Sequence, residues 1–180
     1  MSMTNRVLHT DELSASNPAL RAGDRVLLSG QIYTARDAAH KLIFKMLDNG
    51  ESLPVPIKGS VIYYAGPTPA RPGMAVGSCG PTTSGRMDIY APRLLDMGLS
   101  AMIGKGARDK SVCDAIVRNG AVYFCAVGGA GALIAKHIIK SEQVMFPELG
   151  CESVKRMTIR DMPLLVAIDP YGGNLFSDSF

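Results

Sequence analysis

Short links between successive strands and helices in the second half of the chain restrict its fold more than any other feature. A strand over residues 99–103 leads into a helix over about 109–119, and a strand over 121–127 leads into a helix that opens at Gly128 and runs through Ile139. Strand–helix units with such short links pair their strands in parallel. We therefore expect an α/β domain whose parallel strands present their carboxyl ends at one edge of the sheet.

The rest of the chain makes the expected sheet a mixed one. Further strands are expected over residues 25–29 (ended by Gly30), 61–65, 74–79, 154–159 and 164–169, and a turn over 170–174. Further helices are expected over about 35–48, capped by Thr34 and stopped at Asn49-Gly50, and over about 87–97, ended at Gly98 and burying Ile89, Tyr90, Leu94 and Leu95. The helix over 109–119 is expected to end at Gly120 and to bury Val112, Ile116 and Val117. We expect residues 1–20 to form a loose or docking segment and residues 21–180 to form a single domain.

The composition is typical of a soluble globular protein. The chain has 180 residues, 47% of them hydrophobic and 19% charged, which is enough for one well-buried core. Its net charge of +3 is too small, and its Lys and Arg residues are too scattered, to predict nucleic-acid binding. The first residues lack the apolar core of a signal peptide, and the apolar run over 121–135 is too short to cross a bilayer. We expect a cytoplasmic protein without a membrane segment.

The spacing of cysteine and histidine residues predicts no metal site on this chain. The cysteines match neither a C-x-x-C pair nor the ligand runs of zinc or iron–sulfur sites, and the histidines are equally dispersed. These residues are Cys79, Cys113, Cys125, Cys151, His9, His40 and His137. Mostly apolar or small neighbours favour buried free thiols.

A compact polar loop, Gly80-Pro-Thr-Thr-Ser-Gly-Arg-Met-Asp88, follows the strand expected over 74–79. Its glycines allow close backbone approach to a ligand, and its proline stiffens the turn. Thr82, Thr83 and Ser84 offer hydroxyls that donate and accept hydrogen bonds, and Arg86 offers a planar fork that suits a carboxylate. A rigid polar loop between a strand and a helix predicts a functional site. The alternative is a well-capped turn with a solvated Arg86.

Two further candidates fall in the first turn of the helix over 35–48. The positive charge of Arg36 is unfavourable at a helix N-terminus unless an anion binds there. A simple surface pair between Arg36 and Asp37 is an equal alternative. His40 lies one turn further along, where we expect it to be a satisfied partner of a neighbouring loop rather than a catalytic base.

Two glycine-rich breaks lie at the ends of the two parallel strands. Lys105, flanked by glycines, is expected at the same sheet edge as Thr82 and is interpreted as a ligand contact, with a solvated turn lysine as the alternative. The loop from Gly128 to Gly131, which contains Gly129, indicates close packing or a carboxylate-binding helix start. It does not match a dinucleotide fingerprint, because Ile134 stands where a small residue is required.

Several of these segments together resemble one known family. Besides Gly80–Asp88, they are Thr34-Ala-Arg-Asp-Ala-Ala-His40, Gly104-Lys-Gly-Ala-Arg108, Val127-Gly-Gly-Ala-Gly-Ala132, Glu148-Leu-Gly150 and the stretch from Asp169 to Phe176. The chain resembles, from about Ala22 to Phe176, the β subunit of class I fumarate hydratases and the related L-tartrate dehydratase β subunit. The resemblance implies the swivelling β/β/α domain of these dehydratases, with a mixed sheet and short parallel β–α units.

The resemblance also implies an active site shared with another polypeptide. An α subunit, or a fused N-terminal domain, would carry three cysteines that hold a [4Fe–4S] cluster, in an expected α2β2 assembly. Thr82 would take part in proton transfer with an acidic residue of that partner. Arg36, Arg86 and Lys105 would hold the carboxylates of a C4 dicarboxylate, a task that needs several cations. Asp37, His40, Thr83 and Gly129 lie in the matching segments and are further candidates.

Three functions remain in competition. Gly85 and the loop from Gly104 to Arg108 look more like the fumarase branch, which favours interconversion of fumarate and L-malate. Dehydration of L-tartrate or another hydroxy-diacid is the second interpretation. The third is a binding or regulatory module that retains an anion pocket without catalysis.

Overall fold

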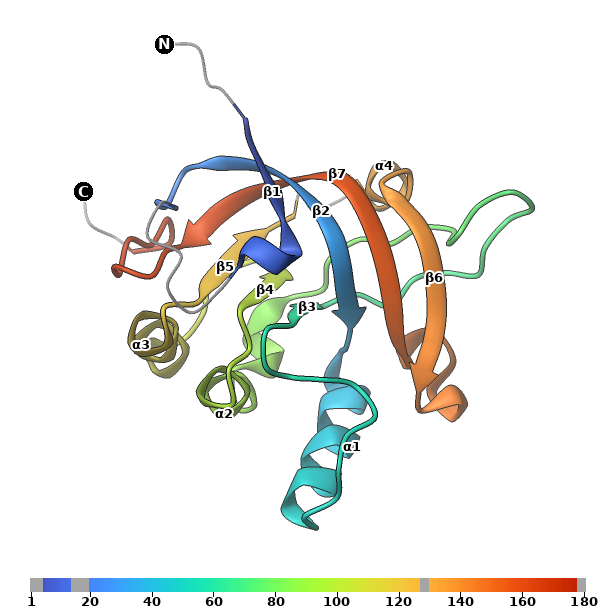
Figure 1. Cartoon of the computed structure of the whole chain (residues 1–180), viewed down its shortest axis with the longest axis horizontal. Coiled ribbons are helices and arrows are strands. Elements are labelled where there is room, and N and C mark those ends of the chain that lie inside the picture. The colour runs from blue at the N-terminus through green and yellow to red at the C-terminus, as the bar shows by residue number, and fades with distance from the viewer. Residues whose placement is uncertain (1–4, 14–19, 127–129, 178–180) are drawn as a thin grey trace.

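Seven strands and four α-helices form the part of the chain that the computed structural model describes, residues 5–13, 20–126 and 130–177 (Figure 1). The strands are β1 (Arg6–His9), β2 (Arg25–Thr34), β3 (Val61–Tyr63), β4 (Ala101–Gly104), β5 (Val122–Cys125), β6 (Ile138–Met145) and β7 (Val154–Ile168). The α-helices are α1 (Asp37–Asp48), α2 (Ala91–Asp96), α3 (Lys110–Asn119) and α4 (Gly131–Ala135). Three short 3-10 helices are η1 (Thr10–Glu12), η2 (Ser84–Met87) and η3 (Pro147–Glu152).

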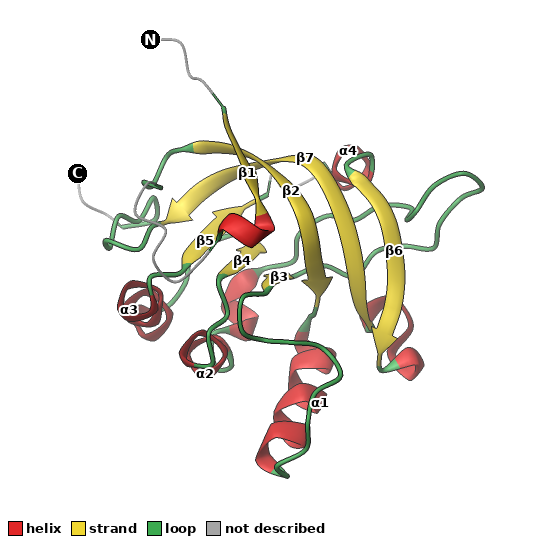
Figure 2. Cartoon of the chain, in the orientation of Figure 1, coloured by secondary structure: helices red, strands yellow, loops and turns green. Residues whose placement is uncertain are grey.

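The sheet closes on itself. β2 pairs in parallel with β3, β3 with β4, and β4 with β5, while β7 runs antiparallel to both β5 and β2. These strands form a closed ring, with β1 added beside β2 and β6 added beside β7. Figure 2 shows the long, curved β2, β7 and β6 on one side and the shorter β3, β4 and β5 on the other. The parallel pairing predicted from the strand–helix units is confirmed.

Alternate residues of the parallel strands face two different cores, as the pleat of a strand requires. Tyr63 and Ile103 belong to the core inside the ring, whereas their neighbours Tyr64 and Met102 belong to the core beneath the helices. α2 and α3 contribute Leu94, Leu95, Val112, Ala115 and Ile116 to this second core. The layers are therefore sheet, sheet and helix, which is the predicted β/β/α arrangement.

The prediction that Gly30 ends a strand is wrong, because β2 continues from Arg25 to Thr34. The pairing of β2 with β7 shifts its register between Leu28 and Gly30, and Gly30 has a φ of 119°. A glycine with such a φ lets an irregular strand continue instead of stopping it. A side chain at Gly30 would also meet the Thr10 hydroxyl, at 2.2 Å from its Cβ.

The predicted cap of the first helix is also wrong. Thr34 lies at the end of β2, where its hydroxyl accepts a hydrogen bond from the Lys155 backbone N–H at 3.1 Å. The helix begins at Asp37, and Arg36 occupies the N-cap position in extended conformation without a side-chain cap. The predicted helix end is confirmed, because Asn49 is the C-cap.

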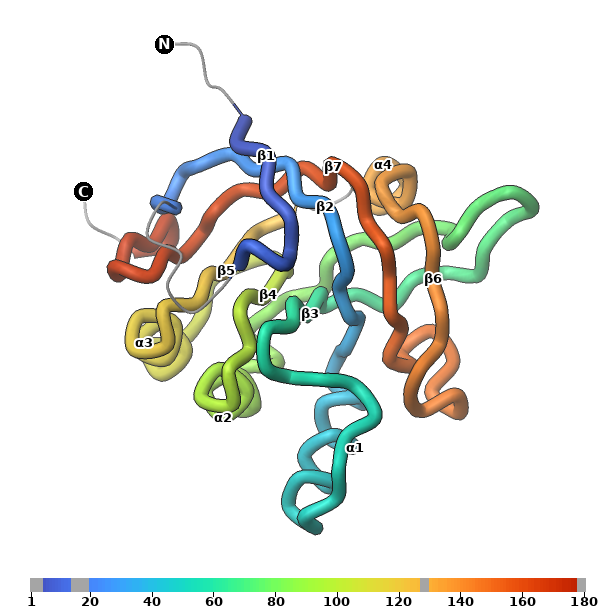
Figure 3. The backbone as a smooth tube through the Cα atoms, viewed as in Figure 1, coloured from blue at the N-terminus to red at the C-terminus, as the bar shows by residue number. Residues whose placement is uncertain are grey.

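Three further predictions of elements need correction. The two tail strands are one strand, β7, with Asp161 at a φ of 48° along it. Residues 74–79 form no strand. They are half of a projecting arm, whose two sides are joined by a hydrogen bond from Thr68 N–H to Ser78 O at 2.9 Å (Figure 3). The helix expected to run through Ile139 ends at Ala135, and β6 begins at Ile138.

The helix expected over 87–97 is divided into η2 and α2, with a turn between them. Ile89 lies in that turn and is 78% exposed, so its predicted burial is wrong. Val117, on α3, is 43% exposed and its burial is wrong as well. The predicted helix ends at Gly98 and Gly120 are confirmed by their φ angles of 94° and 62°.

The described part of the first twenty residues docks on the body. β1 pairs with β2, and Leu13 and Leu20 are buried in the core of the ring. Over the described ranges 5–13, 20–126 and 130–177, no helix is both long and apolar enough to cross a membrane.

Candidate active site

The loop from Gly80 to Asp88 meets other loops at the carboxyl edge of the parallel strands, as predicted. The Thr82 backbone N–H donates to Tyr64 O just after β3, at 2.7 Å. Ser84 N–H donates to Lys105 O just after β4, at 3.0 Å, and Cys79 N–H donates to Gly131 O at 3.0 Å. Gly129 lies outside the described residues.

Thr82 and Thr83 occupy different positions on this edge. Thr82 is half-buried, and its hydroxyl makes no hydrogen bond within the described residues. Thr83 is exposed, and its backbone pairs with that of Lys105. A threonine hydroxyl needs a neighbouring base or carboxylate to move a proton at neutral pH. Among the described residues, no base or carboxylate forms a hydrogen bond with the Thr82 hydroxyl.

Arg86 is held by Asp37. The guanidinium Nε donates to Asp37 Oδ1 at 2.9 Å, and Nη2 donates to Asp37 Oδ2, which leaves the Nη1 edge for another acceptor. The Arg86 hydrogen bond holds the pKa of the Asp37 carboxyl below its usual value. Both side chains are partly exposed, so the pair contributes little to stability. Arg86 is exposed, as the well-capped-turn alternative expects, but its guanidinium is paired with Asp37.

Arg36 is paired with Glu152 of η3. Its Nε lies 3.2 Å from Glu152 Oε1, and this nitrogen is buried without a hydrogen bond of its own. The surface pair with Asp37, which was the equal alternative, is replaced by this contact with Glu152. The guanidinium passes over Gly66, where an added Cβ would lie 2.9 Å from Arg36 Nη1. Gly66 therefore provides the room that Arg36 occupies.

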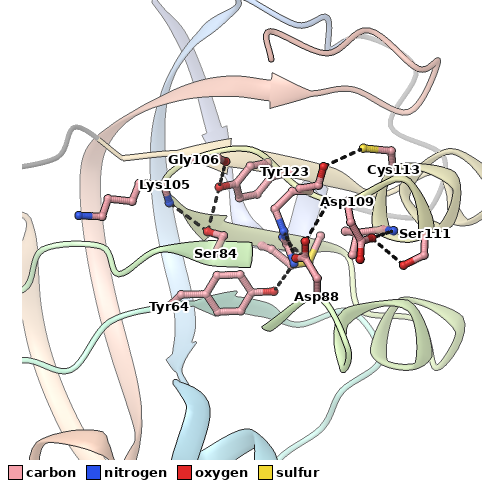
Figure 4. A network of polar contacts seen from close by, with 12 residues as sticks. Tyr64, Ser84, Asp88, Lys105, Gly106, Asp109, Ser111, Cys113 and Tyr123 are labelled. Atoms are coloured by element: carbon pink, nitrogen blue, oxygen red, sulfur yellow. Dashed lines mark hydrogen bonds and ion pairs between the residues drawn. The ribbon is translucent and has the colours of Figure 1, made fainter. Parts of the chain in front are cut away.

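Lys105 carries an exposed ammonium group that makes no ion pair with any residue in the described ranges. Figure 4 shows its side chain pointing away from the network that holds its backbone. Gly104, just before it, packs so closely on the loop that a Cβ there would lie 1.9 Å from Ser84 Oγ. The backbone of Lys105 is fixed while its charge stays available.

A buried ion pair that the sequence pattern did not mark supports this edge. Arg108 Nε donates to Asp88 Oδ1 at 2.6 Å, and Asp109 N–H donates to Asp88 Oδ2 at 2.8 Å (Figure 4). The Arg108 side chain is fully buried, between the rings of Tyr64 and Tyr123. Asp88 and Arg108 are the last residues of two segments that resemble the family. The resemblance was therefore the sequence signal that could have pointed to this buried pair.

Ser84 joins the loop to the two strands beneath it. Its Oγ accepts the Lys105 backbone N–H at 3.0 Å. The Tyr123 hydroxyl lies 2.9 Å from both Ser84 Oγ and Gly106 O. It donates its one proton to one of these oxygens, and where that oxygen is Gly106 O, the Ser84 hydroxyl donates to the Tyr123 oxygen. The hydroxyl of Ser84 is thus a structural tie beneath Thr82 and Lys105.

His40 is buried in the first half of α1, and its partner is not a neighbouring loop. Its Nδ1 lies 2.8 Å from Arg36 O in the preceding turn, and its Nε2 has no hydrogen-bond partner in the described structure. Burial lowers the pKa of His40 to about 4, so the ring is neutral at physiological pH. The expectation of a satisfied loop contact is therefore wrong.

The described residues of this chain offer no ligand set for a metal ion or cluster. No three His, Cys, Asp or Glu side chains gather in residues 5–13, 20–126 and 130–177. Burial raises the pKa of the Cys79 thiol to about 12, so it resists forming the thiolate that a metal ligand requires. Cys151 is exposed, Cys113 and Cys125 are half-buried, and all four cysteines are free, so the expectation of buried thiols is wrong for three of them.

A mixed sheet that closes on itself, with helices packed against its parallel strands, defines the chain as a small α/β domain. Within that class, the model of the family described as fumarase C-terminus matches residues 2–179. The chain therefore belongs to the fumarase C-terminal family.

Curated relatives fall into two groups by length. The chain is 44% identical to "Fumarate hydratase 2" of Leishmania major and 43% identical to "Fumarate hydratase class I, aerobic" of Escherichia coli strain K12. These matches cover 86% and 84% of this chain but only 28% of each relative. It is 38% identical to "Putative L(+)-tartrate dehydratase subunit beta" of Methanocaldococcus jannaschii, over 88% of this chain and 85% of that protein. The relatives named here are hydro-lyases by name.

Proposed function

We propose that this chain is the β-type subunit of an iron–sulfur hydro-lyase that interconverts fumarate and L-malate. The observation that supports the proposal is that Arg86 lies on the Thr82 loop, that Lys105 pairs with this loop through Thr83, and that Arg36 reaches over Gly66. Its support from relatives is the match to fumarate hydratases at 44% and 43% identity. The chain spans about a quarter of those relatives, so the activity of the whole enzyme needs further polypeptide.

In this proposal the cations bind and orient the substrate. A C4 dicarboxylate carries two carboxylates, and arginine forks bind such groups with two parallel hydrogen bonds. Arg86 offers its Nη1 edge, Arg36 its terminal nitrogens, and Lys105 a mobile point charge. Fixing both ends of the substrate would bring its reacting carbons beside Thr82.

Thr82 is proposed to transfer the proton. Hydration of fumarate adds a hydroxyl to one alkene carbon and a proton to the other, and the reverse reaction removes both. The Thr82 hydroxyl is free of hydrogen bonds to the described residues, so it is available to a substrate and to an acidic residue of the partner.

The [4Fe–4S] cluster is assigned in this proposal to an α-type partner. The described residues of this chain do not provide a ligand set for it. When bound to the partner, the cluster would act as a Lewis acid at the substrate hydroxyl. A separate β subunit is supported by the match to 85% of a relative named as a subunit beta, and an α2β2 assembly in the cytoplasm completes the proposal.

Dehydration of L-tartrate is the second candidate. The match that covers 85% of a relative is to a tartrate dehydratase subunit, so the subunit architecture favours this branch. Higher identity to the fumarate hydratases favours the first. A module that only binds an anion is the third, and it predicts binding without turnover.

The test is an anaerobic reconstitution with the α-type chain from the same organism. Fumarate absorbance is followed after addition of L-malate, for the wild type, Thr82→Ala, and the exposed strand variant Thr158→Ala as the control. We expect turnover only with both chains, a loss of at least about a hundredfold for Thr82→Ala, and no change for the control. Full activity of Thr82→Ala would contradict the role of Thr82.

A further inference from the structure

His40 is enclosed by two aromatic rings beneath the candidate site. Its imidazole stacks on Tyr90 at 5.4 Å between ring centroids and meets Tyr64 edge-on at 5.7 Å. No part of the residue is exposed to solvent. A side chain so enclosed either fills space or fixes its neighbours, and its hydrogen bonds distinguish these roles.

The imidazole hydrogen bond is not needed to form the helix. Arg36 O already accepts the His40 backbone N–H at 2.9 Å, as the ladder of α1 requires. The Nδ1–H of the neutral ring adds a second hydrogen bond to the same carbonyl at 2.8 Å. Its Nε2 is buried without a hydrogen-bond partner among the described residues, which costs stability. A phenyl ring would fill the same space without that cost.

The neighbours of His40 belong to two parts of the candidate site, the Arg36 side chain and the Thr82 loop. Arg36, whose carbonyl the ring contacts, holds the guanidinium that faces Glu152. Tyr64, whose ring the imidazole touches, accepts the Thr82 backbone N–H on its carbonyl at 2.7 Å. The Arg108 Nη2 approaches the Tyr64 hydroxyl at 3.4 Å and ties that ring to the buried ion pair.

We propose that His40 is a positioning residue that sets Arg36 and Thr82 relative to one another for a single dicarboxylate. The roles of Arg36 and Thr82 in this statement rest on the proposed function. The imidazole acts through the Arg36 carbonyl and the Tyr64 ring, and it contacts neither substrate nor reacting atoms. A polar group kept in the core at a cost in stability is expected where function requires it.

The first arm of the test uses the isolated chain, so it does not depend on any activity. Amide hydrogen exchange is compared by NMR for the wild type, His40→Phe and Phe44→Leu. Phe44 also packs on Tyr90, at 4.8 Å between centroids, one turn further along α1. For His40→Phe we expect a melting temperature equal to or above that of the wild type, with exchange of the Thr82 amide about tenfold faster. The Phe44→Leu control should leave the Thr82 amide unchanged.

The second arm measures kinetics in the complex with the α-type chain. His40→Phe is expected to raise KM for the dicarboxylate about tenfold with a smaller change in kcat, because binding needs both ends of the site in register. His40→Asn keeps a donor near the position of Nδ1 and should recover most of that loss in KM, despite a lower melting temperature.

Two results would overturn the proposal. One is a His40→Phe chain that melts at a lower temperature while its Thr82 exchange rate stays at the wild-type value, since that is the behaviour of a space-filling residue. The other is an active wild-type complex in which His40→Phe leaves KM unchanged. A wild-type complex without turnover counts against the proposed function alone, because the exchange measurement still decides the role of His40.

Discussion

Each of the two arginines of the candidate site forms an ion pair with a carboxylate of another element. Asp37 takes the Nε and Nη2 edge of Arg86, and Glu152 faces the Nε of Arg36. Guanidinium groups restrained in this way lose less freedom when they bind an anion. The carboxylates thus restrain the two guanidinium groups, and they neutralise part of the charge that an anion would meet.

Replacing Gly66 by alanine should disturb Arg36 selectively. The new Cβ would lie 2.9 Å from Arg36 Nη1 and 3.2 Å from Cys151 O, so the guanidinium has to move while the strands remain in place. We predict a KM for the dicarboxylate raised by about tenfold, equivalent to about 1.4 kcal/mol of binding. Steady-state kinetics and circular dichroism check this, and an unchanged KM would show that the position of Arg36 does not matter for binding.

The buried imidazole of His40 predicts a loss of stability in acid. Its pKa is lowered by burial to about 4, below the value of about 6.5 in an unfolded chain. The unfolded state therefore binds a proton first, and stability falls as the pH drops from about 6.5 toward 4. Relative to His40→Phe, the wild type should lose up to about 3 kcal/mol over this window. Urea denaturation at several pH values measures it, and parallel curves for the two proteins would contradict the low pKa.

At the scale of elements, the buried pair of Asp88 and Arg108 joins the end of the site loop to the start of α3. Because Arg108 is fully buried, removing its partner leaves an unpaired charge in the core. Asp88→Asn should lower the free energy of unfolding by about 3 to 5 kcal/mol. Asp96→Asn, which breaks the half-exposed pair with Arg118, is the matched control and should cost less than about 1 kcal/mol. Equal losses in urea denaturation would refute the distinction.

Helix ends and parallel pairing were predictable from the sequence because they depend on local rules. Gly50, Gly98 and Gly120 mark the ends of their helices through positive φ angles, a backbone conformation that neighbours hardly influence. The long antiparallel strands were not predictable in the same way. β2 continues through Gly30 because β7, more than a hundred residues away in sequence, pairs with it on both sides of an irregularity.

The site could be predicted in its residue types but not in its partners. Loops after parallel strands share an edge, so Thr82 and Lys105 were expected together. That Arg36 pairs with Glu152, and that Asp88 reaches Arg108, depends on contacts between loops that no local pattern encodes. The burial predicted for Ile89 was wrong because a turn interrupts the helical spacing on which that prediction rested.

At the scale of the whole molecule, the described residues place three cations near the Thr82 loop and no base beside the Thr82 hydroxyl. These cations are Arg36, Arg86 and Lys105, and the Thr82 hydroxyl is left unpaired within the described ranges. Curated fumarate hydratases are more than three times as long as the part that this chain matches, since it spans 28% of them. The proposed α-type partner would complete such a site.

The most direct test of the central claim is a comparison of kcat/KM for L-malate and L-tartrate in one reconstituted complex with an intact cluster. We predict turnover of L-malate to fumarate, with kcat/KM at least about tenfold above that for L-tartrate. A preference for L-tartrate would contradict the fumarase assignment and favour the tartrate branch. No turnover of either substrate by an intact complex would contradict a hydro-lyase of either kind and leave an anion-binding module.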